Sequence, residues 1–143
     1  MPNKSMYLGA ATENHIVSML LKEEREVYLP VVDDHGVDIL VMTRNSGVNK
    51  NNNRYQEIQV KSKTYDGLFA AVKCPNPQPN YWFIFYVRQH DTICLINSMD
   101  FVKIASQNKK GKNIGLYSLS LATNNGIRKA MQQYIVSDFS RIP

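Results

Sequence analysis

Polar side chains recur at every second position in the stretch RYQEIQVKSKTY, residues 54–65. The polar positions are Glu57, Gln59, Lys61 and Lys63, and apolar residues separate the first three. Because successive side chains of a strand point to opposite faces, this pattern predicts a strand with one apolar and one polar face. Such a polar face is either a solvated sheet surface or one wall of an active site.

Asp38 stands inside a second apolar stretch, VDILVMT, residues 37–43. Strict alternation would place Asp38 on one face with Leu40 and Met42, and Val37, Ile39 and Val41 on the other face. An aspartate within an apolar strand is costly to bury unless it is paired or binds a metal. A polar, asparagine-rich segment joins this stretch to residues 55–64, so we expect the two strands to be antiparallel neighbours.

Glu13 lies in a stretch, residues 11–27, whose apolar residues have helical spacing. Thr12 is the expected N-cap of this helix, which would place Glu13 in its first turn. Glu13 also stands three and four residues before Ile16 and Val17, which puts it on the stripe that faces the sheet. A Glu, an Asp, a Gln and a Lys would then meet at one edge of the sheet. Hard oxygen ligands suit Mg²⁺, and a neighbouring lysine can position a water or stabilise developing charge.

The elements that must position these residues form one α/β or α+β domain spanning residues 1–143. The aromatic run YWFIFYV, residues 81–87, predicts a central strand buried on both faces. The other expected strands are residues 26–32 (broken or at an edge because of Pro30), 92–97 after a hairpin, and 115–121. We expect helices at residues 98–107, with Ser98 as N-cap, and at residues 124–136, and a short helix or irregular segment at 66–73.

Composition favours an ordinary globular protein, with 43% hydrophobic and 20% charged residues. Cys74 and Cys94 lack metal-site spacing, so we interpret them as reduced thiols of a cytoplasmic protein. We expect no membrane segment, because no stretch approaches the roughly 18 apolar residues that a span needs.

The net charge of +5 is unevenly distributed along the chain. Residues 1–48 contain four Lys/Arg and seven Asp/Glu, a net of −3, whereas residues 49–143 contain thirteen and five, a net of +8. A basic region of this kind would suit a polyanionic partner such as DNA. The expected contacts to DNA phosphates come from Lys63, Lys73, Lys109, Lys110 and Lys112.

Together, Glu13 on a helix, "VD" at 37–38 and "QVK" at 59–61 resemble the PD-(D/E)xK nuclease superfamily, which has a restriction-endonuclease-like fold. The resemblance covers roughly residues 9–97 and is to members with QxK in place of (D/E)xK. These members include group-I-intron-encoded homing endonucleases and Mrr-like restriction proteins. The resemblance implies a mixed central sheet flanked by helices.

The same resemblance implies a role for each matching residue. Asp38 would be the central ligand of Mg²⁺ or Mn²⁺, Gln59 would offer its amide oxygen, and the carbonyl of Val60 would add a ligand. Glu13 would contact the metal directly or through water, and Lys61 would orient the attacking water or stabilise the transition state. The implied activity is endonucleolytic hydrolysis of DNA phosphodiester bonds, and cutting both strands would require a homodimer or higher oligomer.

Two departures from the family pattern leave alternatives open. Val37 stands where the proline of "PD" is usual, and Gln59 replaces a carboxylate, which removes one negative charge from the site. The domain could therefore be a catalytically inactive nuclease-fold module for DNA binding or assembly. A third interpretation is an interaction domain without a nucleic-acid partner, since each of the residues alone also has a structural explanation.

Overall fold

The computed structural model describes residues 3–32, 36–44, 54–63, 69–72, 76–112 and 114–143. The side chains of Lys63 and of residues 69–72 are not part of this description. The predictions made for the Lys63 side chain, for Lys73 and for Cys74 therefore lie outside the described residues.

Two α-helices and eleven strands form the described part of the chain. The helices are α1 (Lys4–Lys22) and α2 (Ser98–Ile104), and two 3-10 helices are η1 (Arg88–His90) and η2 (Lys129–Tyr134). The strands are β1 (Val27–Tyr28), β2 (Ile39–Met42), β3 (Tyr55–Lys63), β4 (Phe69–Val72), β5 (Tyr81–Val87), β6 (Thr92–Asn97), β7 (Ser106–Gln107), β8 (Tyr117–Ser120), β9 (Ala122–Thr123), β10 (Gly126–Ile127) and β11 (Ile135–Val136).

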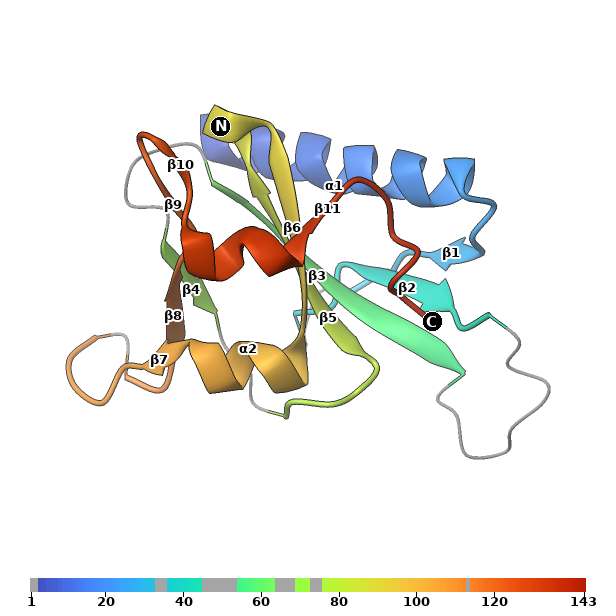
Figure 1. Ribbon diagram of the computed structural model, residues 1–143. Coiled ribbons are helices and arrows are strands. Elements are labelled where there is room, and N and C mark those ends of the chain that lie inside the picture. The colour runs from blue at the N-terminus through green and yellow to red at the C-terminus, as the bar shows by residue number, and fades with distance from the viewer. Residues whose placement is uncertain (1–2, 33–35, 45–53, 64–68, 73–75, 113) are drawn as a thin grey trace.

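The central sheet has six described strands in the order β1-β2-β3-β5-β6-β11 (Figure 1). The β3–β5 pair is parallel, and the other pairs are antiparallel. The predicted antiparallel pairing of β2 with β3 and the central place of β5 are confirmed. The fold is therefore a mixed α/β fold with a mostly antiparallel central sheet flanked by helices, as expected for a nuclease-like fold.

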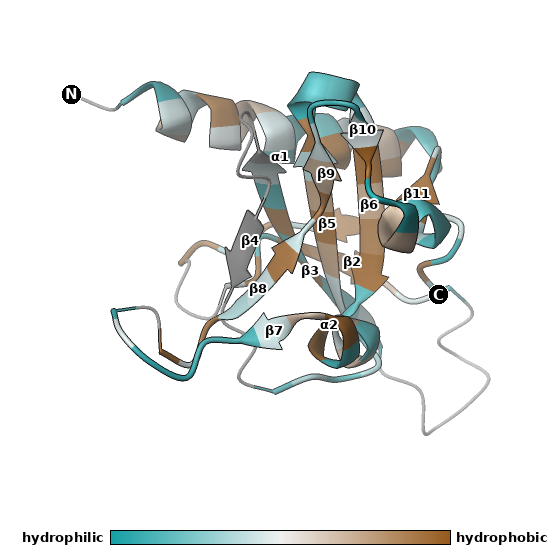
Figure 2. Ribbon diagram, turned by 60° about the vertical axis from the view of Figure 1, so that its left-hand side comes forward, coloured by the Kyte–Doolittle hydropathy of each residue, from teal (hydrophilic) through white to brown (hydrophobic). Residues whose placement is uncertain are grey.

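The two faces of the sheet bury separate apolar clusters. One cluster joins Ile16 and Leu20 of α1 to Ile58 and Val60 of β3. The other cluster joins the alternate residues of β5, beginning with Tyr81, to Phe101 of α2 and to side chains of β8, β9 and η2. Figure 2 shows the predominantly apolar strands β5 and β6 between α1 and α2. Because side chains alternate, Gln59 and Lys61 lie on the face opposite to α1.

Within the described residues, no helix is long and apolar enough to span a membrane.

Helix α1 begins eight residues earlier than Thr12, the expected N-cap. Its N-cap is Asn3, whose side chain accepts a hydrogen bond from the backbone N–H of Met6 at 3.1 Å. Thr12 is instead buried in mid-helix, where its hydroxyl donates to the carbonyl of Leu8 at 2.9 Å. Glu13 therefore lies near the middle of the helix, and the prediction that it occupies the first turn is wrong.

Strands occur in two segments for which we expected other structure, residues 66–73 (a short helix or irregular segment) and residues 124–136 (a helix). Residues 69–72 form β4, which pairs with β8, a partner about 50 residues away. Within residues 124–136, β10, η2 and β11 replace the expected α-helix, and β10 pairs with the preceding strand β9. The apolar residues there have helical spacing, but the pairing of β11 with β6 outweighs this helical tendency.

Smaller corrections concern the element boundaries. The strand expected over residues 26–32 is limited to β1 at the sheet edge, which agrees with the edge position expected from Pro30. The N-cap of α2 is Asn97 rather than Ser98. The Ser98 hydroxyl instead donates to the carbonyl of Gln78 at 2.7 Å and accepts from its N–H at 2.9 Å.

Candidate active site

Asp38 lies immediately before β2 and is hydrogen-bonded to the neighbouring strand β3. Its Oδ2 accepts a hydrogen bond from the backbone N–H of Val60 at 2.7 Å, and its own N–H donates to the carbonyl of Ile58 at 2.9 Å. Regular pairing of β2 with β3 begins only at Ile39, so the carboxylate provides the acceptor that Val60 lacks at this point. The interaction holds Asp38 against the QVK segment.

The strand alternation expected around Asp38 does not extend back to Val37. Ile39 belongs to the cluster on the α1 side, whereas Val37 packs against the cluster on the other side of the sheet. The prediction that these two residues share a face is therefore wrong. Gly36, with φ of +71°, turns the chain just before this point, and strand geometry starts only at Ile39.

Gln59 is almost fully buried, with 8% of its surface exposed. Its Oε1 accepts a hydrogen bond from the hydroxyl of Tyr81 at 2.9 Å. On the nitrogen side, a Cβ added to Gly36 would lie 3.2 Å from Nε2 of Gln59, so the glycine backbone packs closely against the amide. The amide of Gln59 is thus held between the start of β5 and the turn that precedes Asp38.

Lys61 follows Gln59 on the same face of β3 and is partly exposed. Two residues along a strand separate the two Cα atoms by about 7 Å. The next residue, Ser62, points to the opposite face, where its hydroxyl accepts from Nε of Arg88 at 2.8 Å. The Lys61 side chain therefore leaves β3 on the same face as Gln59, while Ser62 links β3 to the helix side.

Arg88 connects the middle of α1 to the end of β3. Its guanidinium donates to the carbonyl of Leu8 at 2.9 Å and to the hydroxyl of Thr12 at 2.7 Å, as well as to Ser62. Glu13, next to Thr12, is partly buried on this helix. The guanidinium contacts fix the position of the Glu13 backbone relative to the end of β3, although Glu13 belongs to the helix on the far face from Gln59.

The candidate metal ligands near Asp38 offer oxygen atoms, but few of these oxygens belong to carboxylates. Among the described residues, no three His, Cys, Asp or Glu side chains form a group that could hold a metal. A metal held here would instead combine the Asp38 carboxylate with neutral oxygens, the Gln59 amide and the Val60 carbonyl. Glu13, the further ligand predicted from the sequence, would have to reach this group from the helix that packs on the other face of the sheet. Such a set fits Mg²⁺, which binds oxygen through one or two carboxylates and retains several waters.

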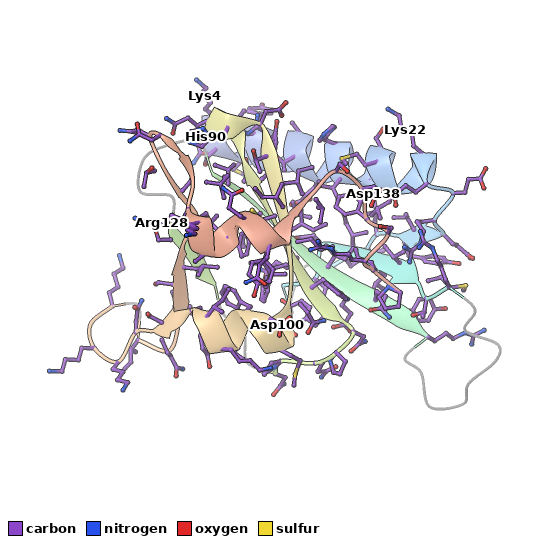
Figure 3. The ribbon with its side chains drawn as sticks, viewed as in Figure 1. Lys4, Lys22, His90, Asp100, Arg128 and Asp138 are labelled. Carbon is purple, nitrogen blue, oxygen red and sulfur yellow. The ribbon has the colours of Figure 1, made fainter. Side chains whose placement is uncertain are left out.

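The described lysines predicted to contact DNA lie on one loop. Lys109, Lys110 and Lys112 are exposed between β7 and β8. Other cations also lie at the surface: Figure 3 shows Lys4 and Lys22 at the two ends of α1, extending away from the sheet. Arg128, which the figure shows on the opposite side of the molecule from Lys22, donates to the hydroxyl of Ser120.

Tyr81 and Gly36 are site residues that the sequence pattern did not reveal. Tyr81 is the first residue of the aromatic run and is 6% exposed, so its type and context indicated a core residue. The signal that could have identified it is the hydroxyl itself, because a buried tyrosine O–H generally has a hydrogen-bond partner. Gly36 precedes Asp38 by two residues, and its positive φ is typical of glycine.

The sequence matches no protein-family model and no curated protein. The fold, in contrast, is similar to that of a solved structure, the bacterial homing endonuclease I-Ssp6803I. The similarity has a TM-score of 0.59 at 14% sequence identity and covers 94% of this chain and 88% of the other. The chain therefore shares its overall fold with a bacterial homing endonuclease.

Proposed function

We propose that the protein is a metal-dependent DNA endonuclease of the PD-(D/E)xK type, in its QxK variant. The observation that carries the proposal is the contact between Asp38 and the QVK segment, where the carboxylate lies 2.7 Å from the backbone nitrogen of Val60. The resemblance to the superfamily rests on these residues, and the contact brings them together. The similarity of the whole fold to a homing endonuclease supports the same conclusion.

In this proposal, Asp38, Gln59, the carbonyl of Val60 and Glu13 hold Mg²⁺ or Mn²⁺. When bound, the metal would supply Lewis-acid stabilisation of the charge that develops at the scissile phosphate. Lys61 would orient the attacking water or stabilise the charge on the phosphate oxygens, since its side chain leaves β3 on the same face as Gln59. The exposed lysines of the β7–β8 loop, together with Lys63 and Lys73, would contact DNA phosphates.

A decisive test compares nicking of supercoiled plasmid DNA by the wild type and by Lys61→Met, with Mg²⁺ or Mn²⁺. Lys103→Met is the matched control, because Lys103 is exposed and its ammonium lies 3.7 Å from Asp100 on α2. We expect Lys61→Met to lose at least about 100-fold in rate and the control to retain its rate. Equal rates for both variants would contradict the role of Lys61, and absence of metal-dependent cleavage on a library of cloned target sequences would contradict the activity. Gel filtration of the active protein would test the expected homodimer or higher oligomer.

A second candidate function is an inactive nuclease-fold module that binds DNA or assembles with other proteins. Gln59 itself favours this alternative, because a neutral amide stands where the family has a carboxylate ligand. Under this alternative, DNA binding would be independent of metal and unchanged in Lys61→Ala. A fluorescence anisotropy titration with and without Mg²⁺ separates the two functions.

A further inference from the structure

The hydroxyl of Tyr81 contacts the site from the neighbouring strand. Tyr81 begins β5, and the parallel register aligns Gln59 with Phe83, two residues further along that strand. Tyr81 and Gln59 therefore lie diagonally opposite on one face of the sheet, where the hydroxyl donates to Oε1 at 2.9 Å. Both side chains are nearly buried, at 6% and 8% exposure. A hydrogen bond in such a place strongly restricts the rotation of the amide.

The same amide is confined from its other end by Gly36. A Cβ at residue 36 would lie 3.2 Å from Nε2 and 3.5 Å from Cδ of Gln59. The Tyr81 hydroxyl oxygen also lies 3.4 Å from the carbonyl oxygen of Gly36. Gln59 is thus enclosed by a tyrosine hydroxyl and a glycine backbone. Its Oε1 faces the hydroxyl of Tyr81, and its Nε2 is the amide atom nearest to Gly36.

We infer that Tyr81 is a positioning residue, whose hydroxyl orients the Gln59 amide so that its oxygen serves as a metal ligand. This inference rests on the proposed function. An amide oxygen has two lone pairs, so the bond from Tyr81 uses one and leaves the other for a cation. A free glutamine side chain, in contrast, would lose rotamer freedom on binding the metal and could present its nitrogen instead. The tyrosine therefore compensates for the weaker ligand that stands in place of a carboxylate.

The test is Tyr81→Phe, which removes the hydroxyl and retains the ring that packs 5.0 Å from Phe83 between centroids. Tyr86→Phe is the matched control, because Tyr86 lies on the same strand and its hydroxyl donates to Asp91 at 2.6 Å, away from Gln59. The measured signal is the side-chain amide resonance of Gln59 in an NMR spectrum, assigned by its loss in Gln59→Glu. Mn²⁺ is then titrated, and its binding is followed by the paramagnetic broadening of this resonance.

We expect the Gln59 amide resonance to shift in Tyr81→Phe and not in Tyr86→Phe. The Mn²⁺ concentration for half-maximal broadening should rise about three- to tenfold, the factor that one neutral hydrogen bond contributes. In a Gln59→Met background, where Mn²⁺ binding is followed by water proton relaxation, Tyr81→Phe should have no further effect, because its influence passes through Gln59.

Two results would overturn the inference. An unchanged Gln59 resonance in Tyr81→Phe would mean that the hydroxyl does not hold the amide, and an unchanged Mn²⁺ midpoint would mean that holding it does not assist a ligand. Neither measurement requires cleavage. A wild type that binds Mn²⁺ beside Gln59 but cuts no DNA would therefore contradict the proposed function and leave the positioning role of Tyr81 intact.

Discussion

Replacing Asp38 separates its structural contact from its proposed ligand role. Asp38→Ala removes the acceptor for the Val60 N–H, whereas Asp38→Asn keeps an acceptor oxygen and removes the charge. Val60 is 6% exposed, so in the alanine variant its N–H would be left largely without a partner. An unsatisfied buried donor costs about 1–3 kcal/mol, and the partial exposure of Asp38 favours the lower part of this range.

The expected loss can be measured by thermal unfolding. For a chain of 143 residues, about 1–2 kcal/mol corresponds to a decrease in Tm of roughly 3–7 °C. Asp38→Asn should unfold within about 2 °C of the wild type, because the hydrogen bond persists. In the plasmid assay, however, the asparagine variant should lose at least about 100-fold in cleavage rate, since a neutral amide replaces the carboxylate ligand.

The two variants test separately the proposed ligand role of the Asp38 carboxylate and the stabilising contact between Asp38 and Val60. An asparagine variant that cleaves at the wild-type rate would show that the carboxylate does not act in the reaction. An alanine variant with an unchanged Tm would show that the contact with Val60 contributes no stability. Inactivity of the alanine variant alone would not separate these roles, and the asparagine variant is therefore the informative one.

Three further predictions concern stability and reactivity. The Arg25 side chain is 5% exposed and donates to three backbone carbonyls, one on β2 and two in residues 142–143. Arg25→Met should therefore lower the free energy of unfolding, measured in urea, by about 2–4 kcal/mol. An unchanged midpoint of urea unfolding would contradict this expectation. Burial raises the pKa of the Cys94 thiol to about 11, so in a Cys74→Ser background it should react with a maleimide only after unfolding. Labelling of the folded protein would show that the thiol is accessible. Hydrogen bonds from Ser140 lower the pKa of Asp138 below its ordinary value of 3.8, so its stabilising contribution is present above that pH and lost as the pH falls through the folded pKa. The Tm difference between wild type and Asp138→Asn should therefore narrow between neutral pH and about pH 2, and a constant difference would contradict the assignment.

The core of the fold could be predicted because its signals are local. The alternation through residues 55–63 and the aromatic run at 81–87 each indicate a strand with a defined burial, and both strands are present. The pairing of β2 with β3 also followed from the single polar connection between them. This pairing is what brings Asp38 to the QVK segment, so the central contact of the site was within reach of the sequence.

The errors arose where a tertiary contact outweighs a local preference. Asn3, not Thr12, is the N-cap of α1, and within the additional turns Arg88 donates to the carbonyl of Leu8 from the end of β5. Residues 127–136 have helical spacing, yet β11 pairs with β6, a partner about 40 residues earlier in the chain. The contact of Tyr81 with Gln59 depends on the parallel register of β3 and β5, which no pattern within either strand specifies.

The hydrogen bonds within the candidate site bear on how the proposed metal would be held. The Val60 N–H donates to the Asp38 carboxylate and the Tyr81 hydroxyl donates to the Gln59 oxygen, so each of these oxygens shares its electron density with a proton donor before any cation binds. Both bonds orient their oxygens, and each leaves the oxygen a further lone pair for a cation. Mg²⁺ sites with few carboxylates commonly draw further ligands from substrate phosphates. On the proposed function, the DNA phosphate would therefore complete the metal site, so that metal and DNA each strengthen the binding of the other by the same factor.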